Sequence, residues 1–420
     1  MSQNKNVNES SLYKKTVLSN GIRVVSEKIP YVRSVSIGIW IEAGTRDETE
    51  ETNGIAHFSE HMLFKGTKKR NTFEIADALE SLGGGLNAFT GKELTSYYAH
   101  VLDEHLDMAM DVLTDLILNP LLDPKELEKE KNVVLEEIKD FEDALDELIF
   151  DFFFQDLFSP HPISFSTLGK KEVVQGFKRD DLIQFMRSHY SANRIVIAAA
   201  GNLEHQQLVD LTGKYFSSLN SFSTRKLKDY PEDKPARRER TGHTQLTHIC
   251  VGCRAIPYTH EKKYPLLLTN TILGAGMSSR LFQTLREQYG LAYSVFSFSD
   301  FYLDTGVFGV YVGTDEKNID QSIELIINEF NKLRDKKLKE EELTRRQSQL
   351  KGNLLLGLES TSNRMDRLAK MEIYLHEFHT LDDVIHEIDQ VRLKDVIETA
   401  ETFFTPEKVY QTIVKPNHEP

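Results

Sequence analysis

The chain has 420 residues, of which 40% are hydrophobic and 28% charged, and its formal net charge is −14 at pH 7. This length favours two domains of about 200 residues, and the acidic balance argues against nucleic-acid binding because phosphate backbones would be repelled. No apolar run approaches the roughly 18 residues of a membrane span, and the N-terminal residues show no signal-peptide pattern, so we expect a cytoplasmic location.

The first half predicts alternating strands and helices. Strands are expected at 21–29 and 35–44, helices at 54–66 and 72–83, and a strand within 87–102. Long helical patterns follow to about residue 190, and the apolar run 194–202 predicts a buried closing strand. A segment rich in Ser, Pro and charge at 217–245 is interpreted as a linker between a domain at 1–216 and one at 246–420.

The second half resembles a degenerate copy of the first. Three local similarities carry this interpretation, and they pair Leu63 with Leu273, Leu106 with Ile319, and Leu127 with Leu343. The offsets are 210, 213 and 216 positions, as expected for a duplicated domain with small insertions. The fold class is therefore α+β, with two related domains that each pack a β-sheet against helices. At the positions that pair with Glu60 and His61, the second copy has Asn270 and Thr271. These residue types are not the metal-binding ones of the first copy, so at most one metal site is expected per chain.

The segment "GIAHFSEHMLFKGT" at 54–67 contains two histidines four residues apart. A helix turns by about 100° per residue, so its apolar residues share one arc while His57, Glu60 and His61 share the other. Two imidazoles spaced i, i+4 can bind one Zn²⁺, and a neighbouring glutamate can accept a proton from an activated water. The alternative is a solvated polar face. Asn53 is the expected N-cap and Gly66 the expected stop.

A third ligand is expected on the helix "ELEKEKNVVLEEIKDF" at 126–141. Glu130 and Glu137 lie within about 20° of each other on the helix and fall in its apolar stripe with Val133, whereas Glu136 falls on the polar face. A buried carboxylate is unfavourable unless it is paired or bound to a metal. Glu130 and Glu137 are therefore candidate ligands, unless the helix is rotated so that both are exposed.

The pattern H-x-x-E-H with a glutamate 76 positions later, at Glu137, resembles the inverted zinc motif of the pitrilysin-like metallopeptidases, which include the mitochondrial processing peptidase. The likeness covers nearly the whole chain, in blocks such as "GTRDE", "SLGGGLNAFTGKELTSYY", "VVLEEIKDFED" and "MSSRLFQTLREQYGLAYSV". It implies one Zn²⁺ per chain held by His57, His61 and Glu137, with Glu60 as general base. Glu130 matches a second family glutamate that supports the site.

The resemblance also implies substrate contacts. Asn87, Ala88 and Phe89 would contact an extended peptide, and this strand after a glycine turn is suited to accepting an added strand, although an ordinary strand has the same pattern. Arg286 and Tyr293 match an Arg and Tyr pair that reaches the substrate carbonyl in relatives. Longer relatives have four such domains, so we expect a homodimer with composite sites.

Two alternatives remain at this stage. The chain could be a non-catalytic scaffold or partner subunit of the same family, although its ligand set is intact and resembles that of the catalytic-type subunit. The acidic surface could favour basic peptides or serve only for solvation. Cys250 and Cys253 form a C-x-x-C in an expected strand, where residues three apart face opposite sides, so we interpret them as structural.

Overall fold

The computed structural model describes residues 12–222 and 224–417, which form two compact units. Among the described residues, unit 1 comprises those up to Ile138 together with Phe165–Lys228 and Gly357–Leu381. Unit 2 comprises Lys139–Ser164, Asp229–Leu356 and the residues from Asp382 onward. Each unit contains one β-sheet and its own packed helices, so the predicted α+β class is confirmed.

The sheet of unit 1 has the strand order β1-β2-β6-β3-β5-β4. The strands are β1 (Tyr13–Val17), β2 (Arg23–Lys28), β3 (Ser34–Ile41), β4 (Gly85–Thr90), β5 (Thr95–Leu102) and β6 (Ile195–Gly201). The helices are α2 (Ile55–Leu63), α3 (Thr72–Glu80), α4 (Leu106–Leu118), α5 (Pro124–Asp143), α7 (Lys171–Gly176), α8 (Arg179–His189), α9 (His205–Phe216) and α13 (Thr361–Tyr374). β4 is an edge strand that pairs only with β5 in this sheet.

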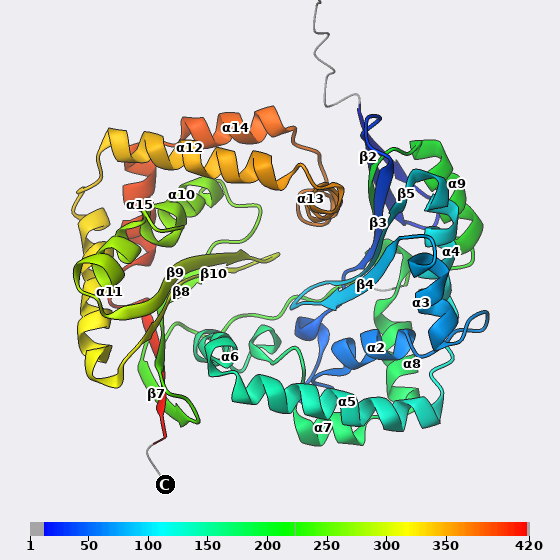
Figure 1. Ribbon diagram of the computed structural model, residues 1–420, viewed down its shortest axis with the longest axis horizontal. Helices are drawn as coiled ribbons and strands as arrows, with labels where there is room; N and C mark the ends of the chain where they lie inside the picture. The colour runs from blue at the N-terminus through cyan, green and yellow to red at the C-terminus, as the bar shows by residue number, and fades with distance from the viewer. Residues whose placement is uncertain (1–11, 223, 418–420) are drawn as a thin grey trace, which may run out of the picture. The chain divides into compact units, whose positions relative to one another are not determined.

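Both faces of the central strands in unit 1 are covered. The side chains of Ile37 and Ile39 enter the main core with α2, α4 and α9. The opposite face of β3 packs against α13, where the Ser36 hydroxyl lies 2.9 Å from that of Thr361. Figure 1 shows α13 on one side of β3 and the helices α4 and α9 on the other. Strands buried on both faces lose the polar alternation of a half-exposed strand, which explains the continuous apolar runs in the sequence.

The sheet of unit 2 has the strand order β7-β11-β8-β10-β9. Its strands are β7 (Arg237–Gly242), β8 (Thr247–Ala255), β9 (Ala292–Phe301), β10 (Gly306–Thr314) and β11 (Tyr410–Pro416). Its helices are α6 (Leu145–Phe158), α10 (Lys263–Gly274), the π-helical segment η5 (Phe282–Gln288), α11 (Ile319–Arg334), α12 (Glu340–Gly357), α14 (Leu381–Gln390) and α15 (Leu393–Phe403). Cys253 packs with α10 and α11, and Cys250 packs with α6 on the opposite face, as the spacing predicted. Both are free and buried.

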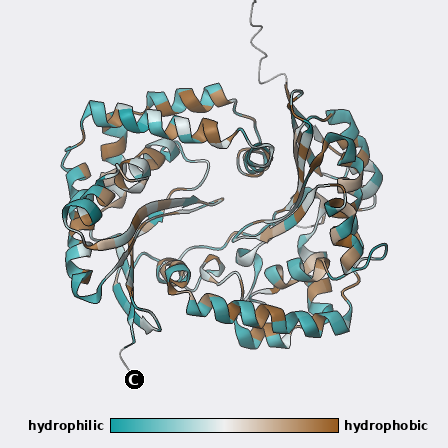
Figure 2. Cartoon of the chain, viewed as in Figure 1, coloured by the Kyte–Doolittle hydropathy of each residue, from teal (hydrophilic) through white to brown (hydrophobic). Residues whose placement is uncertain are grey.

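The predicted internal duplication is visible in the topology. β2, β6, β3, β5 and β4 of unit 1 recur in the same spatial order as β7, β11, β8, β10 and β9 of unit 2, including the parallel pair β2 and β6, which recurs as β7 and β11. α4 begins at Leu106 and α11 at Ile319, the two residues paired from the sequence. Figure 2 shows apolar residues concentrated on the strands and on the helix faces that cover them in both units.

The two halves of the chain exchange one helix each. α6 lies in the first half of the sequence but packs against β8 and β11 of unit 2, whereas α13 lies in the second half and packs against β2, β3 and β6 of unit 1. The sequence predicted a single boundary at 217–245, which would leave α6 in the first domain and α13 in the second. Part of this expected linker forms the strand β7. In the described part of the chain, no helix has both the length and the apolar character needed to cross a bilayer.

Candidate metal centre

The start of α2 is held by a buried carboxylate. Gly54 adopts a left-handed conformation with φ of 96°, and an added Cβ would come within 2.8 Å of the backbone of Gly169, so this close approach requires glycine. The Glu48 carboxylate accepts hydrogen bonds from the backbone N–H groups of Gly54 and Ala56 and from the Asn53 side chain, each at 2.9 Å. The cap expected at Asn53 is therefore supplied by Glu48, and burial raises the pKa of this carboxyl group to about 8 although the three hydrogen bonds oppose the rise.

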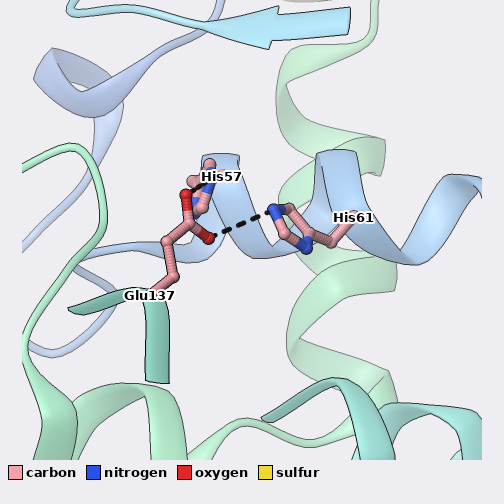
Figure 3. A group of neighbouring side chains, drawn as sticks. All are labelled: His57, His61 and Glu137. Carbon is pink, nitrogen blue, oxygen red and sulfur yellow. Dashed lines mark ion pairs between the residues drawn. The ribbon is translucent and has the colours of Figure 1, made fainter. Parts of the chain in front are cut away.

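Three side chains converge at the middle of this helix. Nε2 of His57 lies 3.7 Å from Oε1 of Glu137, and Nε2 of His61 lies 3.5 Å from its Oε2. Figure 3 shows the Glu137 carboxylate, carried by α5, facing both imidazoles of α2. Each residue offers one ligand atom, and these atoms all lie within 4.8 Å of one another.

The geometry fits a metal of zinc size. A tetrahedral Zn²⁺ with ligand bonds near 2.0–2.1 Å would hold adjacent ligand atoms about 3.4 Å apart. Each imidazole Nε2 lies at a comparable distance from one of the two oxygens of Glu137, 3.7 Å for His57 and 3.5 Å for His61. Two imidazole nitrogens and one carboxylate oxygen are also the donor set of many catalytic zinc sites, which keep one position open for water. Among the described residues, this is the group of three or more metal-binding side chains that the structure brings together.

An outer carboxylate orients His61. Nδ1 of His61 lies 2.8 Å from Oε1 of Glu130, whose Oε2 forms an ion pair with Nζ of Lys65, also at 2.8 Å. Donation from Nδ1 to this carboxylate leaves Nε2 of His61 directed at Glu137, which is the arrangement that supports a metal ligand. Burial alone would raise the pKa of Glu130, but hydrogen bonds from His61 and Lys65 lower it below its ordinary value.

Burial keeps His57 neutral. Burial, reinforced by the neighbouring charge of His61, lowers the pKa of His57 to about 3, so the imidazole keeps the unprotonated nitrogen that a metal requires. Its Nδ1 is buried and has no hydrogen-bond partner in the parts of the chain that the structure describes. The ring is instead packed edge-on against His61, with centroids 4.5 Å apart.

The candidate general base lies on the same helix. Burial raises the pKa of Glu60, and a hydrogen bond from the Thr90 hydroxyl together with the charge of His61 opposes this rise. Thr90 is the last residue of β4, so the hydrogen bond joins the metal-centre helix to the edge strand of the sheet. A raised pKa favours a carboxylate that accepts a proton near neutral pH.

The expected burial of α5 holds for one glutamate and is wrong for the other. Glu130 is 4% exposed, as predicted, but the side chain of Glu137 is 42% exposed and Val133 is 50% exposed. Val133 and Glu137 are four residues apart and share the border of the packed face, whose centre is formed by Val134 and Ile138. The Glu137 side chain is therefore half-exposed, while its carboxylate faces the two imidazoles.

The proposed substrate residues lie on two different units. In unit 1, β4 carries Asn87, Ala88 and Phe89 along the free edge of the sheet, and the side chain of Phe89 is 39% exposed. In unit 2, Arg286 lies in η5 and donates from Nη1 to the backbone oxygen of Tyr293 at 2.9 Å, while the Tyr293 side chain is 59% exposed at the start of the edge strand β9.

Sequence analysis missed several contacts around the centre, namely those of Glu48, Lys65 and Thr90. It also missed that the neighbours of Glu48 are buried and paired. Arg46 pairs with Glu93, and Asp47 forms ion pairs with Arg194 and Arg225 at 2.8 and 2.7 Å. The sequence feature that could have indicated these ion pairs is the run of three consecutive charged residues in "GTRDE" just before the motif helix. Their partners could not be identified from it because they lie far away in the sequence.

Comparisons with known proteins agree with this geometry. Residues 23–171 match the family described as Insulinase (Peptidase family M16), and residues 176–350 match the Peptidase M16 inactive domain. The chain is 41% identical over 394 residues to the uncharacterized zinc protease YmxG of Bacillus subtilis, covering 94% of this chain and 96% of that protein. It is 36% identical to an uncharacterized zinc protease of Streptomyces coelicolor, covering 91% and 85%, and 33% identical to one of Rickettsia felis, covering 92% and 94%.

Solved structures share the whole fold. A protease from Helicobacter pylori superposes with a TM-score of 0.88 at 22% identity and covers 96% of this chain and 99% of that one. A peptidase M16 inactive domain from Pseudomonas fluorescens superposes with a TM-score of 0.89 at 18% identity and covers 96% and 98%. At these identities the likeness is one of fold.

Proposed function

The chain belongs to peptidase family M16, and from this premise we propose that it is a zinc-dependent endopeptidase of the processing-peptidase type. The observation that carries the proposal is the convergence of His57, His61 and Glu137 within 4.8 Å, with Glu60 on the same helix. The names of the zinc proteases that it resembles support the same activity.

In this proposal His57, His61 and Glu137 hold one Zn²⁺ per chain. The bound ion would supply Lewis-acid activation of a water molecule and of the scissile carbonyl group. Glu60 accepts the proton of the attacking water and delivers it to the leaving amine, because it is the carboxylate next to the ligands whose pKa is raised. Glu130 contacts neither water nor substrate in this scheme and keeps His61 oriented.

The substrate is an extended peptide that adds to the free edge of β4. The support is that, among the described residues, β4 pairs on one side only, with β5, and is connected to Glu60 through Thr90. Main-chain hydrogen bonds along Asn87, Ala88 and Phe89 would supply affinity with little dependence on side chains. The formal net charge of −14 supports a preference for basic peptides.

We further propose a cytoplasmic homodimer in which one protomer supplies the zinc centre and its partner supplies Arg286 and Tyr293 to the same substrate. This is tested by mixing a Glu60→Gln protein with an Arg286→Ala protein, each impaired alone, under conditions of subunit exchange. Activity should rise on mixing, because each heterodimer regains one intact site. No rise with exchange demonstrated would contradict shared sites.

The competing function is a non-catalytic scaffold or partner subunit. The Peptidase M16 inactive domain description applies to residues 176–350, which do not include His57, His61 or Glu137, and the intact ligand set of the first half favours the peptidase. The test is cleavage of a mixed peptide pool by the wild-type protein and by Glu60→Gln, with and without a zinc chelator. Wild-type cleavage that is lost with chelator and in Glu60→Gln supports the peptidase, whereas a wild-type protein that binds peptides without cleaving them supports the scaffold.

A further inference from the structure

We propose that Thr90 is a positioning residue whose hydroxyl group fixes the orientation of the Glu60 carboxylate. The inference rests on the proposed peptidase function and deepens it, because it adds a residue that sequence analysis did not single out. Thr90 would not touch zinc or the peptide bond. It would act through Glu60 alone.

The geometry connects the base to a rigid part of the sheet. The Thr90 hydroxyl, at the end of β4, donates a hydrogen bond to Oε2 of Glu60 on α2. Thr90 is paired across the hairpin with Thr95, whose own hydroxyl is buried and donates to the backbone oxygen of Ala43 at 3.0 Å. A hydrogen-bond donor on a paired strand is positioned more precisely than one on a loop. Thr90 can therefore fix the orientation of the Glu60 carboxylate.

The hydrogen bond distinguishes the two oxygens of Glu60. Within the described residues, the Thr90 hydroxyl is the hydrogen-bond partner of this carboxylate. With Oε2 engaged, Oε1 remains available to accept a proton. The terminal torsion of a glutamate is broad and roughly two-fold, so without this contact the carboxylate samples orientations in which neither oxygen is well placed. A base must lie within hydrogen-bond distance of the proton that it removes.

A purely structural role would depend on a different part of the same side chain. Thr90 is β-branched and half-buried on a strand, so its methyl group could matter for packing while the hydroxyl did not. Thr90→Val keeps the shape and removes the hydroxyl, whereas Thr90→Ser keeps the hydroxyl and removes the methyl group. The two variants therefore separate positioning from packing.

The experiment measures kcat, KM and zinc content of the wild type, Thr90→Val and Thr90→Ser on one cleaved peptide. We expect Thr90→Val to lose roughly tenfold or more in kcat, a part of the 10²–10⁴-fold that general-base catalysis contributes, with KM and zinc content nearly unchanged. Thr90→Ser should stay within about threefold of the wild type. Equal kcat in the wild type and Thr90→Val, or equal losses in the two variants, would overturn the role of the hydroxyl.

A second measurement does not depend on activity. In chelated protein, Thr90→Val should lower the urea midpoint of unfolding in the wild-type background and should have no such effect in a Glu60→Ala background, because the contact is then already absent. Equal shifts in both backgrounds would overturn the contact. A wild-type protein that cleaves no peptide would instead contradict the peptidase function itself, so the two failures can be distinguished.

Discussion

Three glutamates of α5 give a graded prediction of zinc affinity. Glu137→Gln removes the carboxylate that faces both imidazoles at 3.5 and 3.7 Å and leaves two imidazole ligands. Glu130→Gln removes the partner of His61, and Glu136→Gln removes an exposed charge next to the ligand. We expect the loss of affinity to fall in the order Glu137, Glu130, Glu136.

The expected magnitudes follow from these positions. Outer partners of metal-binding histidines change affinity by roughly 10- to 100-fold, which is the range expected for Glu130→Gln. Loss of the ligand itself should exceed this, so Glu137→Gln should weaken zinc binding by about 100-fold or more, or about 2.7 kcal/mol. Glu136→Gln changes the net charge by the same amount, but solvent and salt screen an exposed carboxylate, so its effect should stay within about twofold.

The assay is a competition titration of each zinc-free protein against a chromophoric chelator at constant pH and ionic strength. Circular dichroism of the zinc-free variants serves as the control that α5 is still folded. Similar losses in Glu136→Gln and Glu137→Gln would refute the assignment, because affinity would then follow net charge. An unchanged affinity in Glu137→Gln would refute it as well, because another residue would have to be the third ligand.

Three further predictions concern stability. Glu48→Gln should lower the free energy of unfolding by about 1–3 kcal/mol in urea titrations, because an amide leaves an N–H at the start of α2 unpaired; an unchanged value would contradict the cap. The separately expressed segments 1–216 and 246–420 should not fold alone, because the first lacks α13 and the second lacks α6. Cooperative unfolding of either segment would contradict this. His189 lies 2.9 Å from the guanidinium of Arg194, and burial, with the nearby positive charges, lowers its pKa to about 4. Because the folded pKa is below the unfolded value, stability from the neutral ring should be complete above pH 6.5 and fall by up to about 1.4 kcal/mol per pH unit toward pH 4; an identical pH dependence in His189→Asn would contradict it.

The sequence was most informative where local spacing carries the signal. The positions of His57, Glu60 and His61 on one helix face follow from the helical period, and the repeat offsets anticipated the start of α4 and α11 at equivalent residues. Spacing alone also brought Glu130 and Glu137 to one side of α5. It could not give the exposure of Glu137, which depends on how far α2 covers that helix.

Contacts between distant segments were not predictable in the same way. Thr90 is 30 positions from Glu60, and its hydroxyl looks in the sequence like that of any strand threonine. The exchange of α6 and α13 is invisible to periodicity, because an amphipathic helix does not reveal which sheet it covers. The cap at α2 was assigned to Asn53 because local capping rules describe neighbours in sequence, whereas Glu48 acts from a preceding turn.

The most direct test of the proposed function is a zinc titration of the metal-free wild-type protein, with bound zinc and peptide cleavage measured in the same samples. Chelated protein should be inactive, and cleavage should rise in proportion to bound zinc and reach a plateau at about one zinc per chain, the single centre expected of a Zn²⁺ site in one domain. Glu60→Gln should bind zinc with the same stoichiometry and remain inactive. Cleavage that is independent of zinc, or full zinc binding without cleavage by the wild type, would contradict the assignment of a zinc endopeptidase.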